Sequence, residues 1–286
     1  MKITSIKRSL LLLLCSIIFL NLLSGTPSAA TEPPKRIISL APNITEILFA
    51  MGLADRIVGV TTVCDFPEAA RKKPKVGGMS NPSLEAVVAL KPDMVVMTTD
   101  GNPKWFEERL IHLHINTYVF RARKISELAQ GIRDLGLALG EKEKADALAG
   151  DIEKGIDRYR TRSRDIGHSG RKIKALFIIW PEPLIVAGPN TEINDVITLL
   201  GGENVASKAR VSYPAYSVEE ILREPPDIIF IGKGHADAKE MSKGLLRKLA
   251  QVPAVKNGKI FFLSDSLYRL GPRIVPGIEE MDRCLK

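Results

Sequence analysis

The sequence predicts an α/β protein with two parallel-sheet lobes, one long helix that joins them, and a ligand cleft between them. Three observations lead to this prediction. Strand and helix patterns alternate along most of the chain, which is typical of parallel sheets covered by helices. Short phrases in the first half recur in the second half in the same order. A proline-free segment between the halves has the apolar spacing of one amphipathic helix.

Residues 1–30 are set apart from the fold because they have the pattern of a signal peptide. A basic start that includes Lys2 and Lys7 precedes an apolar run over residues 10–23, and small residues lead up to Ala30. A membrane-spanning helix needs ~20 apolar residues, and this run is shorter and interrupted. We therefore expect cleavage after Ala30 and export to the periplasm.

A lipid anchor at Cys15 is not expected. Lipoprotein processing generally requires a small residue before the cysteine, and here Leu14 precedes it within the apolar run. An exported protein without an anchor remains useful in an enclosed space, which favours the periplasm of a double-membraned bacterium.

The first lobe is expected to cover residues 31–140. Its predicted strands are residues 36–41, 56–61, 93–98 and 116–120, and its predicted helices are residues 43–51, 83–91, 103–113 and 126–140. Asn43 can cap the first helix, Glu46 can complete a capping box, and Gly52 can end that helix.

The linking helix is expected over residues 141–165. Its apolar residues recur every three or four positions, at Ala145, Leu148, Ile152, Ile156 and Tyr159. Some 22 residues at ~1.5 Å each would extend ~33 Å, about the width of a small domain. A rigid helical connection of this kind permits only a small closure of the two lobes.

The second lobe is expected to cover residues 171–286. Its predicted strands are residues 172–179, 227–231 and 259–263, and its predicted helices are residues 192–200, 237–250 and 271–284.

Two phrases connect the halves. SLEAVVALKPDMVV returns as SVEEILREPPDIIF with a constant spacing of 134 residues, which relates Ser83 to Ser217, Glu85 to Glu219 and Asp93 to Asp227. PNITE, which begins at Pro42, returns as PNTE at Pro189, and a glycine ends each of the two helices. One echo could be coincidence among common α/β elements, but two in the same order favour two like lobes. Ligands favour such domain interfaces.

The repeated glutamates have two interpretations. Glu85 and Glu219 each stand at the second helical position, where a carboxylate interacts favourably with the helix dipole by ~0.3–1 kcal/mol. In the second copy Glu220 can complete the capping box with Ser217, so Glu219 is not required there. Both interpretations of the two glutamates stay open: they are charges that stabilise the helix ends, or they are docking contacts for a two-fold partner.

The chain resembles the periplasmic cobalamin-binding proteins of ABC importers, within the ferric-siderophore and cobalamin binding group that has a helical backbone linker. The motifs that carry the resemblance are RIISLAPNITE, VGVTTVCDFPEAA, KVGGMSNPSLEAVVALKPD, LIVAGPNTEI, GGENV, ARVSYPAYSVEEIL and SDSLYRLGPR, and they cover nearly the whole mature chain. The resemblance implies a monomeric solute-binding protein without catalysis or a cofactor of its own. It would deliver a cobalt corrinoid or a similar metal chelate to an ABC permease dimer, with Glu85 and Glu219 as the docking residues.

The resemblance also implies that loops after the strands line the cleft. The ligand-binding residues expected from these loops are Cys64, Asp65, Phe66, Met79, Thr98, Trp180, Tyr213 and Arg269. A corrin ring is broad, flat and fringed with amides, and it suits aromatic walls with a few donors. Tyr216 and Tyr268 are expected to pack in the lobes instead.

Other functions remain as alternatives. A ferric siderophore could bind Arg210, Arg269 and Arg273, and haem could use Tyr213 as its iron ligand. A two-lobed enzyme, a chelatase or a transferase, could use acidic loop residues, but the sequence has no phosphate-binding, nucleophile-elbow or HExxH motif. A surface interaction module is disfavoured by the two-lobe echo. No metal site of the protein's own is expected, because the four histidines lie outside the matched loops.

Charge and cysteine content exclude further classes. The chain has 41 Lys and Arg against 33 Asp and Glu, but the basic residues are interspersed with acidic ones and form no basic-aromatic cluster. Nucleic-acid binding is therefore not expected. In the mature chain Cys64 and Cys284 remain, and a disulfide and two free thiols both stay open.

Overall fold

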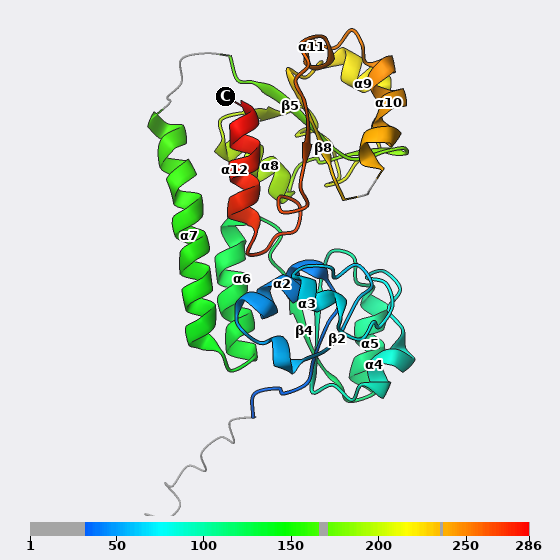
Figure 1. Ribbon diagram of the computed structural model, residues 1–286, viewed down its shortest axis with the longest axis vertical. Helices are drawn as coiled ribbons and strands as arrows, with labels where there is room; N and C mark the ends of the chain where they lie inside the picture. The colour runs from blue at the N-terminus through cyan, green and yellow to red at the C-terminus, as the bar shows by residue number, and fades with distance from the viewer. Residues whose placement is uncertain (1–31, 166–170, 235–236, 286) are drawn as a thin grey trace, which may run out of the picture. The chain divides into compact units, whose positions relative to one another are not determined.

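Two sheets with covering helices confirm the predicted α/β fold (Figure 1). The computed structural model describes residues 32–165, 171–234 and 237–285, so the predicted signal peptide lies outside the described residues. The described residues from Pro34 onward belong to one compact unit.

The N-terminal lobe contains a four-stranded, fully parallel sheet. Its strands are β1 (Ile37–Ser39), β2 (Ile57–Val60), β3 (Met94–Thr98) and β4 (Asn116–Phe120), in the order β2-β1-β3-β4. The other elements of this half are α2 (Pro42–Ala50), the 3-10 helix η1 (Ala54–Arg56), α3 (Glu68–Arg71), α4 (Leu84–Ala89), α5 (Lys104–His112) and α6 (Ile125–Ala138).

The C-terminal lobe repeats this sheet and adds one strand. Its strands are β5 (Lys174–Pro181), β6 (Leu184–Val186), β7 (Glu203–Asn204), β8 (Ile228–Gly232) and β9 (Ile260–Leu263). The parallel pairings give the order β7-β5-β8-β9, which matches β2-β1-β3-β4 strand for strand. The added strand β6 pairs antiparallel with β5, so this sheet is mixed where an all-parallel sheet was predicted. The helices are α8 (Glu192–Leu199), α9 (Val218–Arg223), α10 (Ala238–Lys248), α11 (Pro253–Lys256) and α12 (Ile274–Leu285).

The repeated aspartates have the same structural role in both lobes. Asp93 Oδ2 accepts hydrogen bonds from the backbone N–H groups of Lys35 and Arg36, both at 2.8 Å, just before β1. Asp227 Oδ2 accepts one from the backbone N–H of Lys174, at 2.9 Å, at the start of β5. Each aspartate therefore ties the beginning of one strand to its parallel neighbour and satisfies backbone donors there.

The predicted capping box at the start of α2 is wrong. The N-cap is Ala41, without a side-chain hydrogen bond, and Pro42 takes the first helical position, where its missing N–H costs nothing. The side chains of Asn43 and Glu46 instead bind partners in the C-terminal lobe. The predicted end of the helix is confirmed, since Gly52 follows it with φ +72°.

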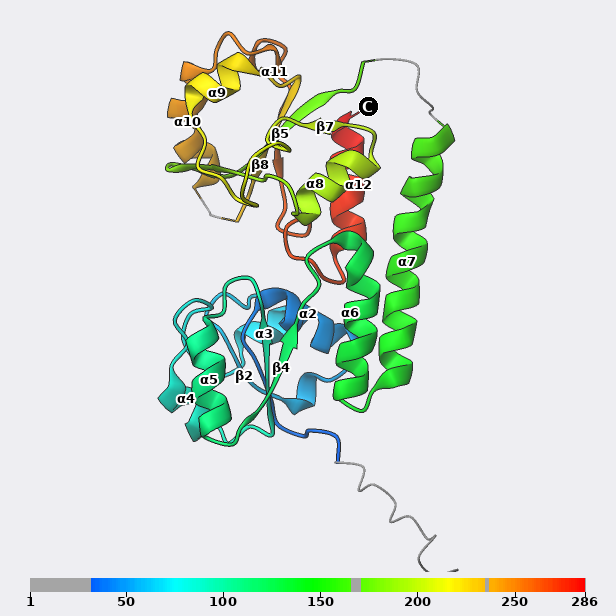
Figure 2. The same cartoon turned by 180° about the vertical axis from the view of Figure 1, so that it is seen from behind.

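The long helix α7 (Lys142–Asp165) lies side by side with α6, and α12 packs beside it (Figure 2). A Cβ at Gly136 of α6 would lie 2.1 Å from the Cβ of Ala145, so glycine permits the close approach of α6 and α7. In the same way, a Cβ at Gly155 of α7 would lie 2.5 Å from the Val275 side chain of α12.

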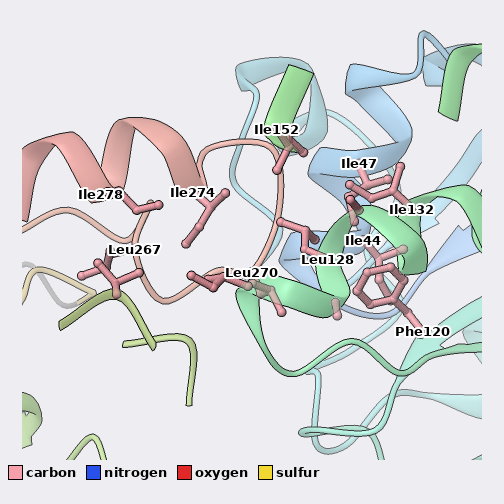
Figure 3. Close-up of a cluster of buried hydrophobic side chains, with 14 of the residues drawn as sticks. Ile44, Ile47, Phe120, Leu128, Ile132, Ile152, Leu267, Leu270, Ile274 and Ile278 are labelled. Carbon is pink, nitrogen blue, oxygen red and sulfur yellow. The ribbon is translucent and has the colours of Figure 1, made fainter. Parts of the chain in front are cut away.

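One apolar core runs through both lobes and these helices. Figure 3 shows part of it: Ile44 and Ile47 of α2, Leu128 and Ile132 of α6, Ile152 of α7, and Ile274 and Ile278 of α12. Burial of each such side chain stabilises the fold by roughly 1.5–3 kcal/mol. The lobes therefore share packed side chains as well as a covalent connection, and large relative movement would expose apolar surface.

None of the helices in the described part of the chain combines the length and the apolar character needed to cross a lipid bilayer.

Candidate functional site

A cavity of about 1090 Å³ lies between the two lobes. Its wall on the N-terminal side consists of Pro42, Asn43, Met79, Thr98, Thr99, Asp100, Gly101, Arg121, Ala122, Arg123, Lys124 and Glu127. Its wall on the C-terminal side consists of Asn190, Glu192, Ser212, Tyr213, Tyr268, Arg269 and Leu270. Most of these residues follow the carboxyl ends of parallel strands, where ligands of α/β proteins usually bind.

Four of the eight expected ligand-binding residues line this cavity: Met79, Thr98, Tyr213 and Arg269. Asn102 positions the first two. Its side-chain oxygen accepts from the backbone N–H of Thr98 at 2.8 Å, and its amide donates to the Met79 carbonyl oxygen at 2.8 Å. Gly101, with φ +104°, leaves room for the Met79 side chain, whose Cε would lie 2.0 Å from a Cβ at that position.

The other four expected residues lie outside the cavity wall. Cys64 is 1% exposed, and its sulfur lies 3.1 Å from Thr45 Oγ1 inside the N-terminal lobe. Trp180 belongs to the β5–β6 hairpin, and its Nε1 donates to the Glu182 carbonyl oxygen at 2.5 Å. The unpredicted strand β6 explains this misplacement, because the hairpin continues where a loop was expected.

Asp65 and Phe66 contact arginines at the joint between the lobes. Asp65 Oδ1 lies 2.5 Å from Arg269 Nη1, and Arg273 lies over the Phe66 ring, 4.2 Å from its centroid. Burial alone would raise the pKa of Asp65, but the hydrogen bond and the charge of Arg269 outweigh it, and that pKa is lowered. These two residues therefore act on the joint rather than on the cavity.

The centre of this joint is Glu46 of α2. Its side chain is 1% exposed and lies 2.6 Å from Arg273 Nη2 and 3.4 Å from Arg269 Nη1. Asp265 binds both arginines from within the same C-terminal loop, with Oδ1 2.8 Å from Arg273 and Oδ2 3.0 Å from Arg269. A carboxylate removed from water in this way requires paired cations, and the two arginines supply them.

Glu192 occupies the matching position in the other half and has a different environment. It follows the N-cap Thr191 of α8 and is 7% exposed. Burial raises its pKa to about 8, although its own backbone N–H lowers that pKa, and Asp100 and Asp195 raise it further. The Tyr213 hydroxyl lowers the pKa of this carboxyl, and burial together with Glu192 raises the pKa of that phenol.

Comparison with known proteins decides the family. The model of the periplasmic binding protein family matches residues 37–267. The chain belongs to the periplasmic binding protein family. A vitamin B12-binding protein of Vibrio campbellii is 31% identical over 270 residues, which are 92% of this chain and 93% of that one. The vitamin B12-binding protein of Vibrio parahaemolyticus is 28% identical over 266 residues, 92% of this chain and 94% of that one.

Solved structures of periplasmic binding proteins have the same fold. The periplasmic vitamin B12 binding protein BtuF of Vibrio cholerae superposes with a TM-score of 0.77 at 28% identity, over 88% of this chain and 97% of that one. The periplasmic heme-binding protein RhuT of Roseiflexus sp. RS-1 superposes with a TM-score of 0.79 at 26% identity, over 87% and 97%. The predicted fold, the family resemblance and the assignment to a transport binding protein are confirmed.

Loops after the strands of both lobes line the cavity, and some of them were not predicted from the sequence. The loop after β4 contributes Arg121, Arg123 and Lys124, and Arg123 Nη2 lies 2.9 Å from Asp100 Oδ1. The parallel-sheet rule could have found this loop, because the predicted strand over residues 116–120 ends directly before it. Glu192 was not predicted, because it was considered only as part of the repeated PNTE phrase.

Of the two tyrosines expected to pack inside the lobes, one lines the cavity. Tyr216 is half-buried and does not line the cavity, whereas Tyr268 does, although packing was expected for both. Burial is the main cause that raises the pKa of Tyr268 to about 12. Tyr268 also packs edge-on against Phe177, with ring centroids 6.1 Å apart, so it has both roles.

The candidate metal ligands and the two cysteines are considered next to the cavity. In residues 32–165, 171–234 and 237–285 no group of three or more His, Cys, Asp and Glu side chains could hold a metal ion. His112 and His114 do not line the cavity, and His168 and His235 lie outside the described residues. Cys64 and Cys284 are free thiols.

The repeated glutamates are exposed at the first turns of α4 and α9. Ser83 Oγ accepts from the backbone N–H of Ala86 and donates to Glu85 Oε2 at 3.0 Å. The backbone N–H of Glu85 and the Ser83 hydroxyl lower the pKa of Glu85. In the second copy Ser217 and Glu220 form the predicted capping box, with Glu219 exposed beside it. Glu219 is therefore free of a capping duty.

Proposed function

We propose that this periplasmic binding protein captures a cobalt corrinoid in the cavity between its lobes and delivers it to the permease of an ABC importer, without making or breaking a bond in the ligand. The observation that carries the proposal is the cavity of about 1090 Å³, which both lobes line. Pockets for drug-sized ligands span roughly 300–1,000 Å³, so this cavity suits a larger guest. The relatives that are similar over more than nine-tenths of the chain are vitamin B12-binding proteins, which supports the corrinoid.

The lining chemistry also fits a corrinoid. Apolar surface from Pro42, Met79 and Leu270 can pack against a flat ring, and methionine adapts to irregular contacts. Uncharged polar groups, among them Asn43, Asn190, Thr99 and Ser212, can hydrogen-bond to peripheral amides. Arg269 is held by Asp65, Asp265 and Glu46, so its charge is already compensated within the protein.

Haem is the second candidate, because Tyr213 and Tyr268 line the cavity and RhuT is a heme-binding protein. A tyrosine ligand binds iron as a phenolate. Burial raises the pKa of both phenols, and the neighbouring Glu192 and Asp100 raise the pKa of Tyr213 further. Both effects disfavour a phenolate, and the cavity therefore fits a corrinoid better than haem.

The test is a calorimetric titration of the purified mature chain with cyanocobalamin, ferric haem and a ferric hydroxamate siderophore. We expect cyanocobalamin to bind with one-to-one stoichiometry and more tightly than the other two. Tighter binding of haem or of the siderophore would identify that compound, and not the corrinoid, as the ligand. If none of the three binds, the proposed function is wrong.

The permease partner is proposed to be a dimer that a monomeric binding protein contacts through Glu85 and Glu219. Both are exposed, they stand in matched positions of the repeat, and Glu219 has no capping duty. Exposed ion pairs contribute ~0–1 kcal/mol each, so these glutamates would set orientation more than affinity.

The docking proposal is tested with the double variant Glu85→Arg and Glu219→Arg. It should bind ligand as the wild type does and fail to support uptake by cells. The matched control is Glu108→Arg with Glu240→Arg, which reverses one exposed glutamate on α5 and one on α10 and should leave uptake normal. Normal uptake by the Glu85 and Glu219 variant would refute the docking role.

Export is proposed to use the leader that ends at Ala30, without a lipid anchor. N-terminal sequencing of the protein from a periplasmic extract should then begin at Thr31. A mature chain that begins at Cys15 with a lipid would contradict this part of the proposal.

A further inference from the structure

Glu192 presents an acidic group to the cavity, and among the described residues no salt bridge engages it. Its side chain lines the cavity at the first turn of α8 and is 7% exposed. Burial raises the pKa of the carboxyl, and its own backbone N–H and the Tyr213 hydroxyl lower it. Since Tyr213 also lines the cavity, a bound ligand would meet the two side chains together.

The charged groups around Glu192 do not neutralise it. Among the described residues Asp100, from the loop after β3, and Asp195, on α8 itself, act on Glu192 as like charges. Arg123 pairs with Asp100. Arg269 binds Glu46, Asp65 and Asp265.

The helices that pack against α8 bring charges that act on Asp195 instead. Lys124, at the start of α6, lowers the pKa of Asp195, and Glu127 of α6 raises it. Arg160 of α7 lies in the groove beside Asp195 and pairs with Asp157 at 2.6 Å. Two titratable groups of the cavity wall remain. Tyr268 is a neutral phenol with a pKa of about 12, and Arg121 is a cation that acts on Tyr118.

A buried carboxylate without a paired cation is costly, and the group avoids that cost by retaining its proton. The pKa of about 8 agrees with this geometry, since at pH 7 the acid would outnumber the carboxylate about tenfold. A carboxylic acid has an O–H donor that a carboxylate lacks. Because Glu192 lines the cavity, a bound ligand can supply the acceptor for this O–H.

We propose that the Glu192 carboxyl recognises the ligand as an uncharged acid that donates a hydrogen bond to a neutral carbonyl oxygen at the ligand's edge. This inference rests on the proposed function for the ligand class, since the amides around a corrin ring offer such oxygens. Ligand binding thereby takes up a proton where the free protein has lost it.

The experiment is calorimetry of cyanocobalamin binding at pH 7 and pH 9, in buffers that differ in ionisation enthalpy. For the wild type we expect about tenfold weaker binding at pH 9 than at pH 7, because one group with a pKa of about 8 must be protonated in the complex. The buffer dependence at pH 9 should report uptake of nearly one proton per ligand bound.

Two variants assign this proton to Glu192. Glu192→Gln keeps an N–H donor but cannot ionise, so its affinity should stay constant between pH 7 and pH 9, without proton uptake. Tyr213→Phe removes the neighbouring hydroxyl and leaves the carboxyl, so the loss of affinity at alkaline pH should persist.

The outcomes separate the two proposals. Wild-type binding that is equal at both pH values, or a Glu192→Gln variant that keeps the wild-type pH dependence, overturns the inference and leaves the proposed function intact. If the wild type does not bind cyanocobalamin at either pH, the proposed function fails and the inference fails with it.

Discussion

Glu46 and Glu192 stand at matched places in the two lobes, and they differ in what neutralises them. Glu46 is 3% exposed and binds two arginines from the other lobe, whereas Glu192 is 7% exposed and has the phenol of Tyr213 beside it. Burial is nearly equal, so the partner determines the chemistry. One copy of the motif holds the lobes together, and the other copy gives the cavity an uncharged acid.

The difference originates in the loops that follow the last strand of each sheet. The loop after β9 carries Arg269 and Arg273 across to Glu46. The matching loop after β4 carries basic residues too, but its Arg123 binds Asp100. At the end of the same loop, the backbone N–H of Ile125 donates a hydrogen bond to Asp195 Oδ2 at 3.2 Å. A repeated architecture can therefore place its charges asymmetrically.

The largest expected effect comes from breaking the Glu46 joint. Arg273→Met should lower the free energy of unfolding by about 3–5 kcal/mol, because it leaves a buried carboxylate with one distant arginine. The measurement is urea unfolding followed by circular dichroism. Arg171→Met is the control: Arg171 is 72% exposed in its pair with Asp227, and its loss should cost less than about 1 kcal/mol. Equal losses in the two variants would remove the distinction between joint and surface pairs.

The next effect concerns Glu192 and depends on pH. Its pKa rises from 4.5 to about 8 on folding, so the folded protein holds a proton that the unfolded chain releases. Stability from this group is present below pH 4.5 and is lost as the pH rises toward 8. We expect the wild type to lose about 3 kcal/mol more than Glu192→Gln between pH 5 and pH 8. Denaturant titrations at both pH values measure this difference, and parallel curves for the two proteins would argue against a buried neutral acid.

The smallest effect should be the same in both lobes. Asp93→Ala and Asp227→Ala each remove an acceptor for backbone N–H groups at the start of a neighbouring strand. Each substitution should cost about 1 kcal/mol, since both side chains are partly solvated and net hydrogen-bond contributions are of that size. Chemical unfolding of the two variants tests this. A large difference between them would mean that the repeated aspartates do not have equivalent roles.

Periodicity predicted the parts of the fold that local sequence determines. Alternation of strands and helices, the proline-free linking segment and the 134-residue register led to two like lobes, and the parallel pairings of both sheets agree. Strand β6 was missed because three residues carry too little pattern, and its hairpin moved Trp180 away from the expected loop. The cap at Asn43 failed because Pro42 already begins the helix.

The site was predicted in part, because loops after strands follow a general rule whereas charge pairing does not. Met79, Thr98, Tyr213 and Arg269 line the cavity through that rule. The partners of Glu46 lie more than 200 residues away along the chain, at Arg269 and Arg273. Only the folded arrangement distinguishes Glu46 from Glu192, because the two motifs read almost alike.

The most direct test of the account is the location of the metal in a crystal of the protein grown with cyanocobalamin, by anomalous diffraction at the cobalt absorption edge. We predict one cobalt peak inside the cavity, between Met79 of one lobe and Tyr213 of the other. A cobalt peak on the outer surface of either lobe, or well-diffracting crystals with no cobalt in the cavity, would contradict it.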